Sequence, residues 1–133
     1  MIDAALLVVP ASEGEFESSM KEGSQTREHA VLLHCLGISH LLVVVNKMDS
    51  TIPLPWSEAR FQFIETAMRG LLQEDIGFSP THIKFLPVSG LLAENLVNLS
   101  PESPLRKWYG YFYSPIDNMG SIFSQNFCTN ICY

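Results

Sequence analysis

The chain has 133 residues, of which 47% are hydrophobic and 17% are charged, and its formal net charge is −6. This length and composition predict one globular domain and exclude a disordered chain. The acidic balance argues against a nucleic-acid-binding face on this chain, and the three cysteines do not form the even disulfide framework of a small secreted protein.

The first predicted element is a strand over residues 4–9, an unbroken aliphatic run that is closed by Pro10. Such a run predicts a strand buried on both faces, as in a parallel sheet covered by helices. No basic region precedes it, so it is not a signal peptide, and no apolar run in the chain is long enough to span a bilayer. We therefore expect a cytoplasmic protein without a membrane partner.

A loop and a helix are predicted next. Residues 12–23 are acidic and interrupted by glycine, which predicts an exposed loop. A helix is predicted over residues 25–36, with Ser24 or Thr26 as its N-cap and Leu36 on its buried face.

A second strand is predicted over residues 40–45, and its apolar run ends abruptly at Asn46, Lys47, Met48 and Asp49. In open parallel sheets, ligands bind outside the carboxyl ends of the strands. An ionised Asp only accepts hydrogen bonds, and guanine offers adjacent N1–H and N2–H donors that one carboxylate can accept together. Adenine has no such pair of donors. This stretch therefore predicts guanine recognition, and a simple turn that ends a strand is the alternative interpretation.

A second helix is predicted to begin after its N-cap, Ser57, and to end at Gly77. Trp56 and Phe61 stand at the N′ and N4 positions of a hydrophobic staple, which fixes the angle at which the chain enters a helix. Apolar residues at helical spacing along this segment predict that one face of the helix is buried.

A third strand is predicted over residues 83–88, followed by Ser89, Gly90 and Leu91 and by a short helix near 93–99. Backbone N–H groups at such a turn can donate to the guanine O6 atom, and Leu91 can pack on the base. The order β-α-β-α-β-α with apolar strands predicts an α/β fold, a parallel sheet in a three-layer arrangement.

The sequence shows no phosphate-binding motif. A P-loop requires Gly-x-x-x-x-Gly-Lys-Ser/Thr, and no Gly-Lys pair occurs in the chain. Residues 117–120 spell the Asp-x-x-Gly of a γ-phosphate switch, but they follow the guanine motif, so we interpret them as coincidence. Cys128 and Cys132 have the spacing of half a metal site, without a second pair of ligands. We predict no catalytic residue and no metal ligand.

The composition changes near residue 110, where a segment rich in aromatic residues with no regular period begins. We predict a domain over residues 1–110 and a tail over 111–133 that is not part of it.

Together, these segments resemble the second half of the GTP-binding domain of eukaryotic translational GTPases. The resemblance covers roughly residues 3–110, and its matching segments are 4–9, 14–17, 25–29, 46–49 and 89–91. It extends to elongation factor one alpha, to the GTPase subunit of the termination factor, and to the Pelota-partner GTPase that rescues stalled ribosomes. Residues 94–96 and 104–109 resemble the rescue GTPase most, with fragments of the other two as alternatives.

The resemblance implies a role for each residue of the two motifs. Asn46 would orient the guanine pocket, Lys47 would lay its stem along the base, and Asp49 would read the guanine edge. The backbone near Ser89 and Gly90 would contact O6. The resemblance also implies that the nucleotide is GTP or GDP. It implies Mg²⁺ in the full-length parent, with no ligand for the ion in this chain. The implied partners of the parent are the ribosome and a Pelota-type factor.

The family's P-loop and switch motifs would precede Met1, so we expect the sequence to be a fragment or truncated gene model of a ribosome-rescue GTPase. Because positioning and charge stabilisation supply nearly all of phosphoryl-transfer catalysis, the chain alone should not hydrolyse GTP and should bind GDP weakly. Its first strand would present an unpaired apolar edge, which predicts poor solubility. The alternative from another class is a non-catalytic α/β interaction module.

Overall fold

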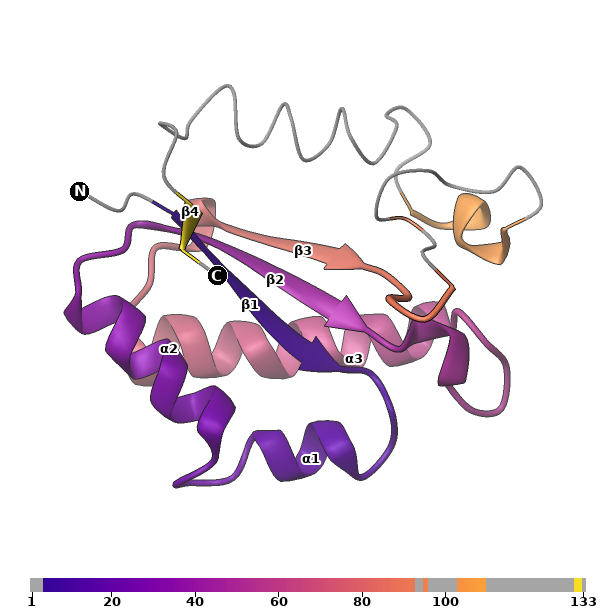
Figure 1. Cartoon of the computed structure of the whole chain (residues 1–133), viewed down its shortest axis with the longest axis horizontal. Coiled ribbons are helices and arrows are strands. Elements are labelled where there is room, and N and C mark those ends of the chain that lie inside the picture. The colour runs from indigo at the N-terminus through magenta and orange to yellow at the C-terminus, as the bar shows by residue number, and fades with distance from the viewer. Residues whose placement is uncertain (1–3, 93–94, 96–102, 110–130, 133) are drawn as a thin grey trace.

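The computed structural model describes residues 4–92, 95, 103–109 and 131–132 (Figure 1). Its strands and α-helices are, in chain order, β1 (Ala4–Pro10), α1 (Glu15–Ser19), α2 (Gln25–Cys35), β2 (His40–Asn46), α3 (Glu58–Arg69), β3 (Ile83–Pro87) and β4 (Ile131–Cys132). Short 3₁₀ turns cover Met48–Ser50, Pro80–His82 and Pro104–Lys107, and a π-helical segment, Gly70–Ile76, continues α3. The helix predicted near residues 93–99 and the motif at 117–120 lie outside the described residues, apart from Asn95.

The sheet is parallel, with the strand order β3-β2-β1-β4. The pairing of β1 with β2 runs from Ala4 opposite His40 to Pro10 opposite Asn46. Since β2 and β3 also pair in parallel, all three long strands end at the same edge of the sheet. The predicted parallel α/β fold is confirmed. The domain boundary near residue 110 stays a prediction.

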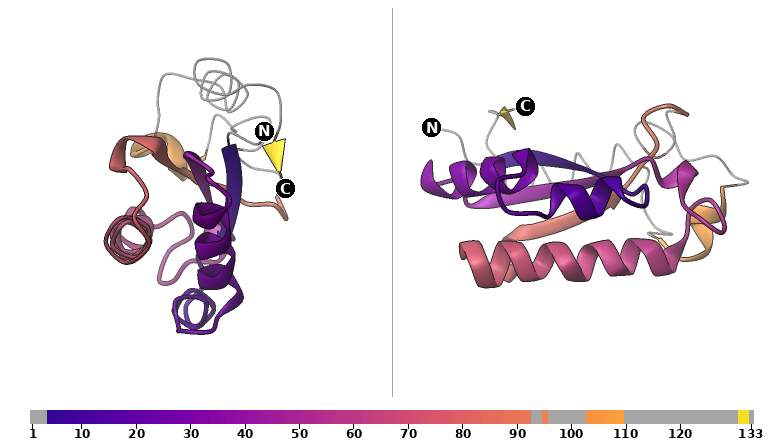
Figure 2. Two further views of the ribbon diagram at one scale, coloured as in Figure 1. Left: turned by 90° about the vertical axis from the view of Figure 1, so that its left-hand side faces the viewer. Right: turned by 90° about the horizontal axis from the view of Figure 1, so that it is seen from below.

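The described helices α1, α2 and α3 all lie on one side of the sheet (Figures 1 and 2). Alternate strand residues on that side belong to the main core, including Leu41, Val43 and Val45 of β2. On the opposite side, Leu42 and Val44 are also buried. The unbroken aliphatic run of β2 is therefore explained by burial on both faces, as predicted.

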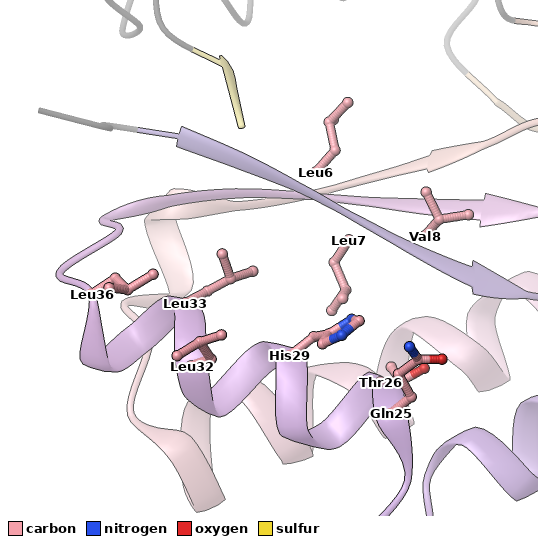
Figure 3. A pocket seen from close by; sticks show the side chains of 9 residues that line it. All are labelled: Leu6, Leu7, Val8, Gln25, Thr26, His29, Leu32, Leu33 and Leu36. Atoms are coloured by element: carbon pink, nitrogen blue, oxygen red, sulfur yellow. The ribbon is translucent and has the colours of Figure 1, made fainter. Parts of the chain in front are cut away.

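The prediction is wrong for part of β1, because Val8 is 57% exposed. Figure 3 shows Val8 and Leu6 on the side of β1 that faces away from α2, and Leu7 on the side that faces it. A cavity of about 530 Å³ follows this edge of the sheet onto α2. We call the half-buried Leu6 and the exposed Val8, Leu32 and Leu36, which line this cavity, the β1–α2 edge.

Two further predictions need correction. Residues 12–23 are not only a loop, because they contain α1, whose Phe16 is 1% exposed and belongs to the core. The helix α2 begins after Ser24, whose hydroxyl accepts from the Arg27 N–H, but Leu36 lies past its end and is 64% exposed. Leu36 lies one turn after Leu32, which is 55% exposed within the helix, so this face of α2 is left uncovered by the described residues both before and at the helix end.

The helix α3 follows the predicted pattern. Ser57 caps it by accepting from the Arg60 N–H at 3.2 Å, and Trp56 and Phe61 are both buried in the main core. The helical segment ends at Gly77, which has the left-handed conformation expected of a residue just past a helix. No helix in the described part of the chain has the length and apolar character needed to cross a membrane.

Candidate functional site

The carboxyl ends of β1, β2 and β3 are joined by backbone hydrogen bonds beyond the sheet itself. The Ala11 N–H donates to the Asn46 carbonyl at 2.8 Å, and the Val88 N–H donates to the Val45 carbonyl at 2.8 Å. The Met48 N–H then donates back to the Val88 carbonyl at 3.2 Å. These bonds hold the segments after β2 and β3 side by side.

A side-chain bond connects the two segments directly. The Gly90 N–H donates to Asn46 Oδ1 at 2.9 Å. A Cβ atom at position 90 would lie 3.4 Å from the same oxygen, so the two segments approach to within van der Waals contact. Asn46 therefore spans the two predicted motifs, although 44 residues separate it from Gly90.

An open pocket of about 600 Å³ lies where these segments meet, a volume in the range of small-molecule sites. It is lined by Ser12, Glu13, Glu15, Asn46, Lys47, Asp49, Ser50, Gly90 and Leu91. The structure thus brings five of the seven predicted site residues to one pocket. The other two, Met48 and Ser89, are fully buried beside it.

Lys47 has a left-handed backbone, with φ 62° and ψ 31°, which turns the chain sharply at the end of β2. Its ammonium group lies 3.0 and 2.9 Å from the two carboxylate oxygens of Glu15. The hydrogen bond from Lys47, and then the one from Ser12, lowers the pKa of the Glu15 carboxyl. The stem of Lys47 lies along the pocket between its fixed backbone and this anchored end.

Met48 attaches the turn after β2 to the hydrophobic core. Its side chain is 0% exposed and belongs to the main core, and its carbonyl accepts from the Trp56 N–H at 2.7 Å. The Thr51 hydroxyl donates to the same carbonyl at 3.2 Å. The third position of the Asn-Lys-Met-Asp motif therefore anchors the motif to the core and does not line the pocket.

Asp49 lines the pocket and is half-buried. Within the part of the chain that the structure describes, its carboxylate accepts no hydrogen bond and forms no ion pair. Both carboxylate oxygens are therefore available to donors that enter the pocket.

The turn after β3 supplies a backbone donor and an apolar surface. The hydroxyl of Ser89 accepts from the Leu92 N–H at 3.2 Å, and the Gly90 N–H is bonded to Asn46. The Leu91 N–H donates to no group among the described residues, and the Leu91 side chain is 87% exposed beside the pocket.

Residues 12, 13 and 15 form a wall of the pocket that sequence reasoning missed. That wall is held by Arg60 of α3, which donates to the Ala11 carbonyl at 2.8 Å and to the Ser12 carbonyl at 3.2 Å. Arg60 also pairs with Glu17 at 2.7 Å, and this bond lowers the pKa of the Glu17 carboxyl to about 2. The only hint in the sequence was the segment 14–17, which we used solely for the family resemblance.

Among the described residues, no three or more His, Cys, Asp or Glu side chains gather in a way that could hold a metal ion. Of the pair noted in the sequence, Cys128 and the side chain of Cys132 lie outside the described residues.

Comparison with known proteins gives the family. Residues 1–106 match the model of the elongation factor Tu GTP-binding domain. Over 107 residues, 80% of this chain, the sequence is 47% identical to elongation factor 1-alpha of Staphylothermus marinus and 46% identical to protein HBS1 of Drosophila melanogaster. The chain spans only 23% and 15% of the length of these two relatives.

Solved structures show the same relationship. The chain superimposes on the crystal structure of sup35 complexed with GMPPNP with a TM-score of 0.76 and 37% identity, over 88% of this chain and 28% of that one. The family match, the parallel fold and the paired segments at the carboxyl ends of β2 and β3 agree. The chain belongs to the elongation factor Tu GTP-binding domain family.

Proposed function

We propose that this chain recognises the guanine base of GTP or GDP in the pocket formed by the segments after β2 and β3. The observation that carries the proposal is the Asp49 carboxylate, which lines the pocket and accepts no hydrogen bond within the described residues. It can accept the guanine N1–H and N2–H donors together.

The expected selectivity follows from the charge on Asp49. A hydrogen bond to a charged group contributes about 1.5–3 kcal/mol, so two such bonds discriminate guanine from adenine by roughly two to four powers of ten. Desolvation of the carboxylate on binding reduces this figure toward the lower end. Adenine offers no pair of donors on the matching edge and would leave the carboxylate unpaired.

The other pocket residues complete the proposal. The Gly90 N–H is bonded to Asn46, and the Leu91 N–H, which has no acceptor among the described residues and belongs to a residue that lines the pocket, would donate to guanine O6. The stem of Lys47 and the exposed side chain of Leu91 would contact the faces of the base. Binding would then cover apolar surface of Leu91 that is 87% exposed without the nucleotide.

The resemblance implies Mg²⁺ at the phosphates of the full-length protein, but the described residues offer no fitting ligand set. No step of the proposal therefore involves a metal. Since the sequence also contains no Gly-Lys pair, we propose that the isolated chain reads the base and does not hydrolyse GTP.

We further propose that the full-length protein is a GTPase that acts on the ribosome, with a Pelota-type factor as partner in the rescue of stalled ribosomes. Residues 94–96 and 104–109 support this choice by their resemblance to the rescue GTPase. The sequence identities to an elongation factor 1-alpha and to protein HBS1, 47% and 46%, are too similar to decide which member of the family the full-length protein is. The test is GTP hydrolysis by the full-length protein in the presence of ribosomes. Stimulation of hydrolysis by a Pelota-type factor, and not by the termination factor, would support the role in ribosome rescue. The reverse pattern would favour the termination GTPase.

Base recognition can be tested on the chain itself by NMR titration with GDP and ADP. We expect GDP to shift the signals of Asp49, Gly90 and Leu91, and excess ADP not to compete. Asp49→Asn should lose GDP and gain xanthosine diphosphate, because xanthine carries an oxygen acceptor where guanine has its 2-amino donor and the Asn amide can donate. Asp75→Asn, which removes a carboxylate at the far end of the fold, is the charge-matched control. Indifference to GDP and ADP would overturn the proposal in favour of the interaction module.

A further inference from the structure

Glu15 lies in a position from which it can control the geometry of the base pocket. It is the first residue of α1 and both its carboxylate oxygens contact the Lys47 ammonium, at 3.0 and 2.9 Å. The two side chains are 51% and 48% exposed. Exposed ion pairs usually contribute little, because two mobile side chains must be ordered together and water screens their charges.

The backbone on the Glu15 side of this pair is fixed more firmly than is usual for a surface loop. Its neighbour Phe16 is 1% exposed, and Glu17 pairs with Arg60, whose side chain is 11% exposed. The Glu17 carboxylate also accepts from the Gly14 N–H at 2.6 Å.

Arg60 is itself held tightly. Its guanidinium donates to the Ala11 and Ser12 carbonyls and lies 5.7 and 5.4 Å from the ring centroids of Phe16 and Phe63. Backbone, carboxylate and aromatic contacts therefore converge on the segment that carries Glu15, so its carboxylate is presented from a rigid support.

The backbone on the Lys47 side is fixed as well. The left-handed turn at Lys47 follows directly from β2, and the next residue, Met48, is buried in the core. With both ends of the pair attached to the core, the remaining freedom is that of the side-chain torsions. Contact with both oxygens of Glu15 restricts those torsions and orders the stem of Lys47.

We propose that Glu15 is a positioning residue for the guanine base. By anchoring the Lys47 ammonium, it holds the methylene stem of Lys47 as a preformed wall of the pocket and balances the lysine charge. The base then binds without ordering this long side chain first. This inference rests on the proposed function of the pocket.

The test compares GDP affinity by NMR titration of the 133-residue chain for the wild type, Glu15→Gln and Glu22→Gln. Glu22 is an exposed carboxylate of the same acidic segment that does not line the pocket, so Glu22→Gln makes the same charge change. We expect Glu15→Gln to weaken GDP binding by about two- to five-fold, the range of an exposed ion pair, and Glu22→Gln to leave it unchanged. The difference should shrink at high salt, which screens the pair.

A second comparison separates positioning from a general structural effect. In a Lys47→Met background, which keeps an apolar stem and removes the ammonium, Glu15→Gln should have no further effect on GDP affinity. A full Glu15→Gln effect in that background would overturn the inference. Equal or tighter GDP binding by Glu15→Gln, while Asp49 still governs GDP binding, would overturn it and leave the proposed function standing. Wild-type protein without Asp49-dependent GDP binding would overturn both.

Discussion

The base pocket and the β1–α2 edge lie on the same sheet and differ in how their exposed groups are satisfied. At the pocket, hydrogen bonds join the segments that carry Asn46, Met48 and Val88, while the Asp49 carboxylate and the Leu91 N–H have no hydrogen-bond partner among the described residues. At the β1–α2 edge, the exposed side chains are apolar, and Leu6 to Pro10 pair with β2 alone among the described residues.

The two surfaces are therefore suited to different kinds of partner. With respect to the described residues, the pocket presents a carboxylate acceptor and an amide donor that have no partner, which suits a small polar ligand. The β1–α2 edge presents apolar side chains, and the backbone of β1 from Leu6 onward has no second partner strand among the described residues, a combination that favours contact with another protein surface. The proposed base recognition and the expected association would therefore use different surfaces of the chain.

The largest expected effect tests whether the base motif is part of the core. Met48→Ala should lower the free energy of unfolding by about 3 kcal/mol, because it leaves a cavity under the motif at a side chain that is 0% exposed. Leu91→Ala, on the other side of the same pocket, should change it by less than about 0.5 kcal/mol, because Leu91 is 87% exposed. Urea unfolding measures both. Equal effects would mean that the motif is not anchored as described.

An intermediate effect on stability is expected from the ion pair between Arg60 and Glu17, which supports the wall of the pocket. The bond from Arg60 holds the pKa of Glu17 at about 2, below its ordinary value of 4.5. A lowered folded-state pKa adds stability above pH 4.5, and this stability is lost as the pH falls toward 2. Because Glu17 is 46% exposed, screening reduces the contribution to about 1 kcal/mol.

Urea unfolding between pH 7 and pH 2 checks this expectation. The stability difference between the wild type and Arg60→Met should be smaller by about 1 kcal/mol at the acid end. Arg27→Met, which removes the exposed pair with Asp75, is the matched control and should keep the wild-type decrease. A pH dependence unaltered by Arg60→Met would show that Arg60 does not hold Glu17 in solution.

The smallest expected effect on stability lies at the β1–α2 edge. Leu32→Gln with Leu36→Gln should change the free energy of unfolding by less than about 0.5 kcal/mol, because the two side chains are 55% and 64% exposed. The same double variant should reduce self-association in light scattering, where we expect the wild type to associate. A wild-type chain that stays monomeric at high concentration would contradict the predicted poor solubility.

The features predictable from the sequence were those that depend on short segments. The aliphatic run of β2 identified a buried strand, and Ser57 identified the start of α3. The pairing of the two base segments followed from one general property, that parallel strands end at the same edge. Asn46 and Gly90 meet for that reason.

The missed features depend on residues that are distant in sequence. The helix α1 has five residues, too few to show a helical period, and the burial of Phe16 relies on Phe63 and Arg60 of α3. Glu15 and Lys47 are 32 residues apart, and nothing near either one marks it as half of a pair. Val8 was predicted to be buried because its strand is aliphatic, yet burial depends on what covers it.

The bond between Gly90 and Asn46 also allows the opening of the pocket to be followed by hydrogen exchange. Gly90 lies in an exposed turn, yet its amide hydrogen is engaged by a side chain that belongs to the end of another strand. That amide exchanges with solvent deuterium when its bond to the Asn46 side chain opens, whereas unfolding of the sheet is reported by the amide of Val88, which donates to Val45. The ratio of the two exchange rates measures how often the bond between Gly90 and Asn46 opens while the sheet stays folded.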